Sequence, residues 1–294
     1  RDDLLRAMLW GALWDLVRES QLPPERFVAL AMRELPREQD EQIVGTLIGR
    51  MSTAISRYVG DDAREAMVRE AAPLLMALAA DSSRAYGPRK NALDAFVGLS
   101  RGPASLAMLD RFLDGDSVAG LALRPPTRWA MVTRLIAQNA PTAAARLAAE
   151  RRRDSTSEGR RLAFVASAAT PDAAQKRELF ARWFSDGELN EEWVTSSLRA
   201  FHDTDQSALT RPFLEMALDT LPWIQKNRRI FFLGSWLGAT LGGQQSAEAL
   251  SSIDGWLRAY PQLSPDLRQK ILQARDELER TVAIRNGRDK RALQ

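Results

Sequence analysis

Apolar residues recur every three or four positions along most of the chain, the spacing that places them on one face of a helix. No run of alternating apolar and polar residues bounded by turn signals stands out, so we expect no strands. The hydrophobic pattern therefore predicts an all-α protein.

Proline and polar capping residues mark where the helices begin. Proline occupies the expected first helical position in segments 102–105, 140–143, 170–173 and 264–267. It is tolerated there because the N–H groups of the first turn have no helical partner. Thr170 and Ser264 are predicted as N-caps, and Ser155 with Glu158 fits a capping box.

The predicted helices fall into pairs. They are 62–80 with 88–100, 103–114 with 127–139, 141–153 with 158–169, 171–185 with 190–202, 206–221 with 228–241, and 246–259 with 264–285. Each pair takes roughly 30 to 42 residues, the spacing of helical-hairpin repeats that bury their apolar faces by stacking. Residues 1–59 add about three leading helices, and residues 60–294 hold about six hairpins. We therefore predict one domain over residues 1–294, a curved α-α superhelix of stacked antiparallel hairpins (HEAT/armadillo-like solenoid).

The composition of the 294 residues, 45% hydrophobic and 27% charged, is typical of a folded globular protein. The absence of cysteine excludes disulfides, thiol catalysis and cysteine-ligated metals, and is compatible with cytoplasm and periplasm alike. Arginine makes up most of the basic residues and alanine is abundant, as in proteins from GC-rich bacterial genomes.

The net charge is only +3, and acidic and basic residues alternate along the chain. The densest basic segment is interrupted by Glu150, Asp154 and Glu158, which weaken its positive field. We therefore expect no nucleic-acid partner. The basic residues of that segment are Arg151, Arg152, Arg153, Arg160 and Arg161.

The first residues are amphipathic and lack the features of a signal peptide, so we expect the chain to be part of a longer one. The most apolar stretch, 230–241, is too short to span a bilayer and follows Arg228 and Arg229. It predicts a buried helix and no membrane span.

No motif for catalysis is present. His202 is the one histidine, so neither H-E-x-x-H nor a Ser-His-Asp arrangement can form within the chain. His202 falls at a predicted helix end, where the helix dipole favours a partly cationic ring, and we expect it to be structural. The chain therefore offers no catalytic residue, metal ligand or cofactor site.

Arginines beside tryptophans are the candidate binding residues. Arg124 and Arg128 stand at a predicted helix start, where a cation is unfavourable and needs another reason to be present. Guanidinium can hold the terminal carboxylate of a peptide while an adjacent ring covers its apolar side chains. The alternative is a structural ion pair with the next hairpin. The candidates are Arg124, Arg128, Trp129, Arg228 and Arg229, the last two shortly after Trp223.

Four segments resemble the C-terminal helical domain of bacterial zinc aminopeptidases of the aminopeptidase N (gluzincin) family. They are 4–31, which begins L-L-R-A-M-L-W-G-A-L-W, 38–50, 114–129 and 227–246 with N-R-R-I-F-F-L-G-S-W-L. The resemblance extends over essentially the whole chain and ends near E-L-E-R-T-V-A-I-R at 277–285.

The resemblance implies a parent enzyme whose zinc, zinc ligands and general-base glutamate lie in an upstream catalytic domain. This chain would be inactive alone and would close over the catalytic cleft, restricting or orienting peptide substrates. The arginines named above would then meet the C-terminal carboxylate of the substrate. A different class of function also fits the helix pattern: a stand-alone α-solenoid scaffold or adaptor that binds a protein or peptide partner in its groove.

Overall fold

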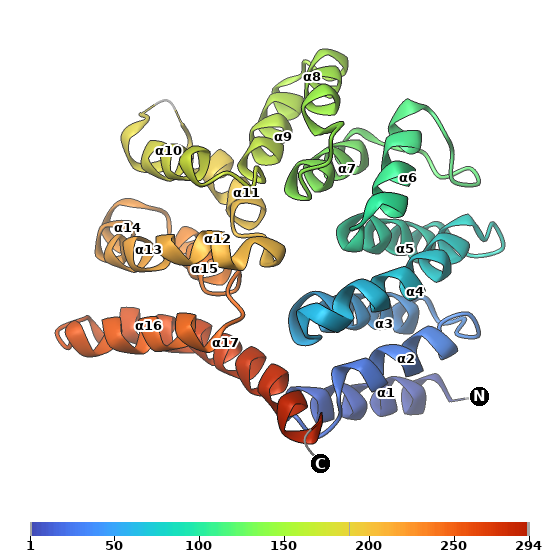
Figure 1. Ribbon diagram of the computed structural model, residues 1–294, viewed down its shortest axis with the longest axis horizontal. Helices are drawn as coiled ribbons and strands as arrows, with labels where there is room; N and C mark the ends of the chain where they lie inside the picture. The colour runs from blue at the N-terminus through green and yellow to red at the C-terminus, as the bar shows by residue number, and fades with distance from the viewer. Residues whose placement is uncertain (1, 188, 293–294) are drawn as a thin grey trace. The chain divides into compact units, whose positions relative to one another are not determined.

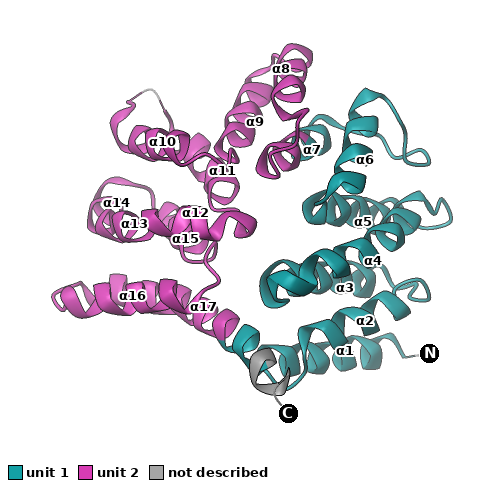
Figure 2. Cartoon of the chain, in the orientation of Figure 1, with its two compact units in different colours: residues 1–131, 283–294 teal, residues 132–282 magenta. Residues whose placement is uncertain are grey.

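A computed structural model describes residues 2–187 and 189–292, most of them helical (Figure 1). Within these ranges no strand forms, and the one β-type contact is an isolated bridge between Val118 and Leu121. The prediction of an all-α fold is confirmed. None of the described helices is both long and apolar enough to cross a membrane. The chain divides into two compact units, residues 1–131 with 283–294 and residues 132–282 (Figure 2).

Unit 1 is built on helices that follow each other closely along the chain. Helix α4 packs against α5, and α3 packs against α5. Its core includes the fully buried Phe27, Leu47, Met51 and Leu75. The helices are α1 (Asp3–Arg18), α2 (Pro24–Glu34), α3 (Glu41–Thr53) continued by the π-helix η1 (Ala54–Tyr58), α4 (Asp61–Ala80), α5 (Tyr86–Leu99), α6 (Pro103–Asp114) and the first half of α7 (Pro125–Ala137).

Unit 2 is centred on helices α9, α11 and α15, which pack in succession. Its core is rich in aromatic rings, and the ring centroid of Trp183 lies 4.8 Å from Phe201 and 5.6 Å from Trp236. Beyond the end of α7, its helices are α8 (Ala143–Arg153), α9 (Ser157–Ala168), α10 (Ala173–Ser185), α11 (Glu191–Phe201), η2 (Thr204–Gln206), α12 (Ser207–Thr210), η3 (Arg211–Phe213), α13 (Leu214–Asp219), α14 (Leu221–Asn227), α15 (Ile230–Thr240), α16 (Ala247–Ala259) and most of α17 (Pro265–Ala292).

Most predicted helices are present with ends within a few residues of the prediction. The clearest exception is the predicted helix 206–221, which the structure breaks into α12, η3 and α13. Pro212 explains the break, because it has no N–H to donate and its ring clashes with the preceding turn. The superhelical arrangement of the hairpins and their likeness to HEAT repeats stay predictions.

The predicted caps are confirmed in part. Of the four prolines predicted at first helical positions, Pro103 and Pro265 begin helices, whereas Pro141 and Pro171 lie two residues before α8 and α10. The hydroxyl of Ser264 accepts from the backbone N–H of Leu267 at 3.4 Å. The other two predicted caps are wrong. Asp172 rather than Thr170 caps α10, and Thr156 rather than Ser155 caps α9, each one or two residues later in the chain.

Candidate functional site

Of the predicted binding residues in unit 1, two are buried. Trp129 is 1% exposed and Arg128 9%. The Arg128 guanidinium donates a hydrogen bond to the carbonyl oxygen of Leu113 at 3.1 Å, in the last turn of α6, where carbonyls lack helical partners. Arg124 is exposed, with its guanidinium carbon 5.7 Å from the ring centroid of Tyr86. The structure thus gives Arg128 a role inside unit 1, and the peptide contact proposed for these three residues stays a prediction.

The predicted residues of unit 2 lie at the junction of α14 and α15. The Arg228 guanidinium lies 5.3 Å from the ring centroids of both Trp223 and Phe232, and it donates to the carbonyl oxygen of Trp183 at 2.8 Å. Arg229 is exposed. Two strongly exposed apolar residues follow it, Ile230 at 78% and Phe231 at 85%. Arg229, Ile230 and Phe231 therefore offer solvent a cation and two apolar side chains together.

His202 and Lys176 form a buried pair of titratable groups in unit 2. Neither ring nitrogen of His202 has a hydrogen-bond partner in the described part of the chain. Burial, and to a smaller degree the charge of Lys176, lowers the pKa of His202 to about 3. Burial also lowers the pKa of Lys176, to about 8. The expected partly cationic histidine is wrong: the ring is neutral at pH 7 because loss of water outweighs the helix dipole.

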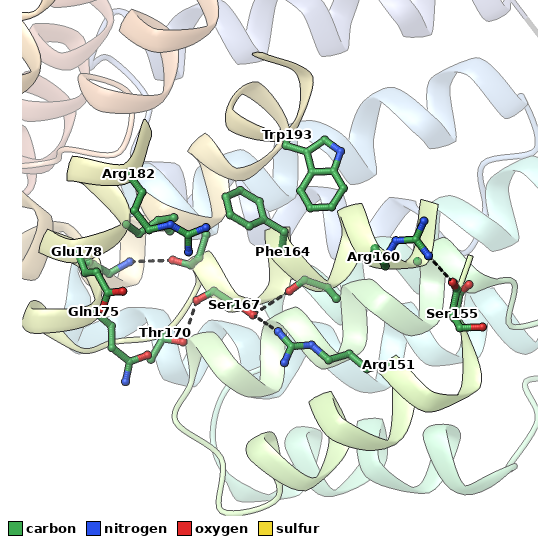
Figure 3. Close-up of a pocket in the computed structure, with 16 residues that line it drawn as sticks. Arg151, Ser155, Arg160, Phe164, Ser167, Thr170, Gln175, Glu178, Arg182 and Trp193 are labelled. Atoms are coloured by element: carbon green, nitrogen blue, oxygen red, sulfur yellow. Dashed lines mark hydrogen bonds between the residues drawn. The ribbon is translucent and has the colours of Figure 1, made fainter. Parts of the chain in front are cut away.

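A pocket of about 640 Å³, here called the α9 pocket, opens between α9, α10 and the start of α11, beside the end of α8 (Figure 3). Gly159, Ala163 and Ser167 recur at four-residue intervals and give α9 a row of small side chains along the pocket. Phe164 and Trp193 form its aromatic wall, with ring centroids 5.5 Å apart. A volume of this size is within the range of ordinary ligand pockets.

Gly159 is required by the close approach of the chain that leads into α9. A Cβ atom at this position would collide with the carbonyl oxygen and the carboxylate of Asp154. The hydroxyl of Thr156 accepts from the Gly159 N–H at 2.9 Å and also donates to Asp154. The turn between α8 and α9, which borders the pocket, is therefore tightly specified.

Two arginines at the α9 pocket are not neutralised. Arg151 donates to the hydroxyl of Ser167 at 3.0 Å, and Arg160 donates to the carbonyl oxygen of Ser155 at 2.9 Å (Figure 3). Neither forms an ion pair with any carboxylate of the described residues. A third arginine of the pocket, Arg182, is paired with Asp186 at 3.0 Å. The pocket therefore has an excess of positive charge beside an aromatic wall.

Sequence analysis did not find this pocket. From the sequence, Arg151 and Arg160 were only members of an interrupted basic segment. The available signal was the four-residue spacing of Gly159, Ala163 and Ser167, which predicts one helix face made of small residues. Among the described residues, no three His, Cys, Asp or Glu side chains come together as metal ligands.

Helix α1 has an exposed apolar face. Its other side buries Trp10 and Val17, while the first turns leave Leu4 and Met8 70% and 63% exposed, with Leu5 and Leu9 also more than half exposed. These four residues, here called the α1 face, follow the i, i+1, i+4, i+5 spacing of one helix side. Adjacent apolar side chains exposed on one helix are typical of a surface that packs against another protein part.

Comparison with known proteins gives two findings. The model of the family described as "ERAP1-like C-terminal domain" matches residues 1–280. Aminopeptidase N of Streptomyces lividans is 28% identical over 284 residues, which is 96% of this chain and 33% of that protein. The chain thus spans about a third of the length of this relative. Because the family model matches nearly the whole sequence, the chain belongs to the family of ERAP1-like C-terminal domains.

Proposed function

We propose that this chain is the non-catalytic C-terminal domain of a zinc-dependent aminopeptidase, where it closes over the catalytic cleft and restricts or orients peptide substrates. Membership of the family and similarity to one third of an aminopeptidase N support an origin in such an enzyme. The structural observation that carries the proposal is the exposed α1 face.

The α1 face is suited to packing on a further domain of the same polypeptide. Fully burying a leucine or methionine side chain contributes about 1.5–3 kcal/mol, so covering four of them would stabilise a domain interface substantially. The face is also flanked by charge, since Arg6 pairs with Glu38 at 2.9 Å and with Asp3 at 2.7 Å. An apolar centre with a polar rim is the usual composition of such an interface.

In this proposal, zinc binding and catalysis belong to another domain of the enzyme. The described residues supply no metal-ligand set, so no chemical step is assigned to them. Their role in the proposal is to bind and position the peptide. The exposed Arg229 with Ile230 and Phe231 is the predicted group in unit 2 that offers a cation and apolar side chains to the C-terminal carboxylate of a substrate and its neighbouring side chain.

The test uses the natural polypeptide that contains this chain. We expect stoichiometric zinc by elemental analysis and release of amino acids from aminoacyl anilides and short peptides, both lost on chelation and restored by zinc. We also expect folded proteins with free amino termini to be poor substrates beside short peptides. A polypeptide without zinc or aminopeptidase activity would contradict the proposal and favour the scaffold alternative.

A further inference from the structure

We propose that the α9 pocket binds a short acidic peptide segment in extended conformation. This inference goes beyond the proposed function and does not depend on it, because every residue of the pocket belongs to unit 2 and none takes part in catalysis. Charge, spacing and the aromatic wall of the pocket each contribute to the assignment.

The pocket has two cations without an acidic partner. Two arginines next to them in the chain are neutralised, since Arg153 pairs with Glu150 at 3.2 Å and Arg161 pairs with Glu158. Arg151 and Arg160 instead donate only to a neutral hydroxyl and a neutral carbonyl oxygen. Both side chains are exposed, so a carboxylate can reach either of them and gain a charge-assisted hydrogen bond.

The spacing of the two cations suits an extended chain. Arg151 is held at Ser167, near the end of α9, while Arg160 lies on its first turns and is held toward Ser155. Seven residues separate positions 160 and 167, and a helix rises 1.5 Å per residue, so these positions differ by about 10 Å along the axis. An extended peptide covers that distance in about three residues. The small side chain of Ala163 lines the pocket between these two positions.

The rest of the pocket indicates which side chains accompany the acidic ones. Phe164 and Trp193 are half-buried and form an apolar wall with Leu179, which suits an aromatic or aliphatic side chain. At α10 the lining changes to Glu178 and the neutralised Arg182. Acidic groups are therefore favoured at the α9 side and disfavoured beside Glu178, which orients the segment.

A peptide fits these features better than a nucleic acid does. Binding a phosphate backbone depends on many cations that each neutralise a phosphate. The α9 pocket offers two uncompensated arginines, and Asp154 and Glu178 also line it. Two carboxylates on one short segment match that number.

The experiment measures binding rather than activity, in the natural polypeptide containing this chain. The probe is N-acetyl-Phe-Glu-Ala-Ala-Glu-amide carrying an uncharged coumarin, and its binding is followed by fluorescence anisotropy. Its blocked termini leave only the two side-chain carboxylates as charges and prevent removal of its first residue by an aminopeptidase. Hydrolysis of a free-amine substrate by the same preparation tests the proposed function separately.

We expect Arg151→Gln and Arg160→Gln each to weaken binding about tenfold, the effect of losing one charge-assisted hydrogen bond. The probe with glutamine in place of glutamate should lose affinity similarly, and raising the salt concentration should weaken the wild-type complex. Arg152→Gln is the matched control, because it removes the same charge from the neighbouring position on α8 outside the pocket lining, and it should leave affinity within twofold.

Far-UV circular dichroism and thermal unfolding check that the variants fold. Arg160→Glu adds an independent arm, since it should reverse the preference toward a probe with lysine in place of glutamate. The proposal is overturned if the double variant Arg151→Gln/Arg160→Gln binds like wild type, if the glutamine probe binds equally well, or if an oligonucleotide displaces the acidic probe at lower concentration.

Discussion

The side-chain nitrogen of Lys176 lies 2.6 Å from the carbonyl oxygen of Phe201 and 3.2 Å from that of Ala168. These carbonyls belong to the last turns of α11 and α9, which have no helical donors of their own. A single buried amine thus connects the ends of two neighbouring helices in unit 2. It also lies 4.5 Å from the Phe201 ring centroid.

Replacing this lysine should weaken unit 2. Lys176→Met keeps most of the length of the side chain but leaves two buried carbonyls without a donor, which costs about 1–3 kcal/mol each. We expect the free energy of unfolding to fall by about 2–4 kcal/mol and amide exchange to accelerate in the last turns of α9 and α11. Lys226→Met, at an exposed lysine of α14, is the control. Equal losses in both variants would contradict this role for Lys176.

The same lysine predicts a pH dependence. Burial lowers its pKa from 10.5 to about 8, so between these pH values the unfolded chain holds a proton that the folded chain has released. Stability from this group should therefore rise with pH across that window, by on the order of 3 kcal/mol, and be lost as pH falls toward 8. Denaturant titrations at pH 7.5, 9 and 10 should show this rise in wild type relative to Lys176→Met, and parallel profiles would argue against it.

His202 makes the opposite end of the pH range important. Burial lowers its pKa from 6.5 to about 3, so the folded protein carries no penalty from this group above pH 6.5. At lower pH the unfolded chain binds a proton that the folded chain does not, and the free energy of unfolding should fall by about 2–3 kcal/mol at pH 4.5. His202→Leu should remove this loss. It should also be nearly neutral at pH 7, since neither ring nitrogen makes a hydrogen bond within the described residues. A variant as acid-sensitive as wild type would assign the acid loss to other groups.

Two helical glycines should respond in opposite directions to alanine. At Gly159 the new methyl group would meet Asp154, so we expect a loss of about 1–3 kcal/mol as the turn before α9 shifts. At Gly234 no atom lies within 4 Å of the added Cβ, and helix propensity should raise stability by up to about 1 kcal/mol. Thermal unfolding of the two variants compares them directly. A destabilising Gly234→Ala would indicate a contact on that face of α15.

The outcome of the sequence predictions follows a physical division. Helix existence depends on local spacing and prolines, so residues such as Pro103 and Pro265 located helix starts correctly. The choice of cap among adjacent polar residues depends on the backbone conformation just before the helix. Asp172 therefore caps α10 in place of the predicted Thr170. Burial depends on helix rotation, so Arg128 could not be distinguished from its exposed neighbour Arg124. The α9 pocket is lined by Arg151 of α8 and Trp193 of α11. Local sequence patterns do not show which residues from different helices come together.

The α1 face predicts a dependence on the rest of the polypeptide. Leu5→Glu with Leu9→Glu would place two charges in the proposed interface, where burial without a partner is unfavourable. In the natural polypeptide we expect faster amide exchange in α1 and weaker discrimination between short peptides and folded proteins. Leu272→Glu, at a partly exposed leucine of α17, is the control and should change neither. Unchanged exchange in the double variant would show that the α1 face is not covered.

The predicted peptide contact can be divided between Arg128 and Arg229. Arg128→Ala removes a buried hydrogen bond to the Leu113 carbonyl, so it should lower the melting temperature and affect all substrates alike. Arg229→Ala removes an exposed cation whose backbone N–H, not its side chain, binds Glu191 at 3.1 Å. In the natural polypeptide it should leave the melting temperature unchanged and raise KM about two- to tenfold for free-acid peptides, an effect that salt reduces. The corresponding peptide amides should be unaffected, because they lack the carboxylate. If Arg229→Ala changes KM equally for acids and amides, this arginine does not bind the substrate carboxylate. If Arg128→Ala raises KM only for the free-acid peptides and leaves the melting temperature unchanged, the buried guanidinium has a binding role that its hydrogen bond to Leu113 does not explain.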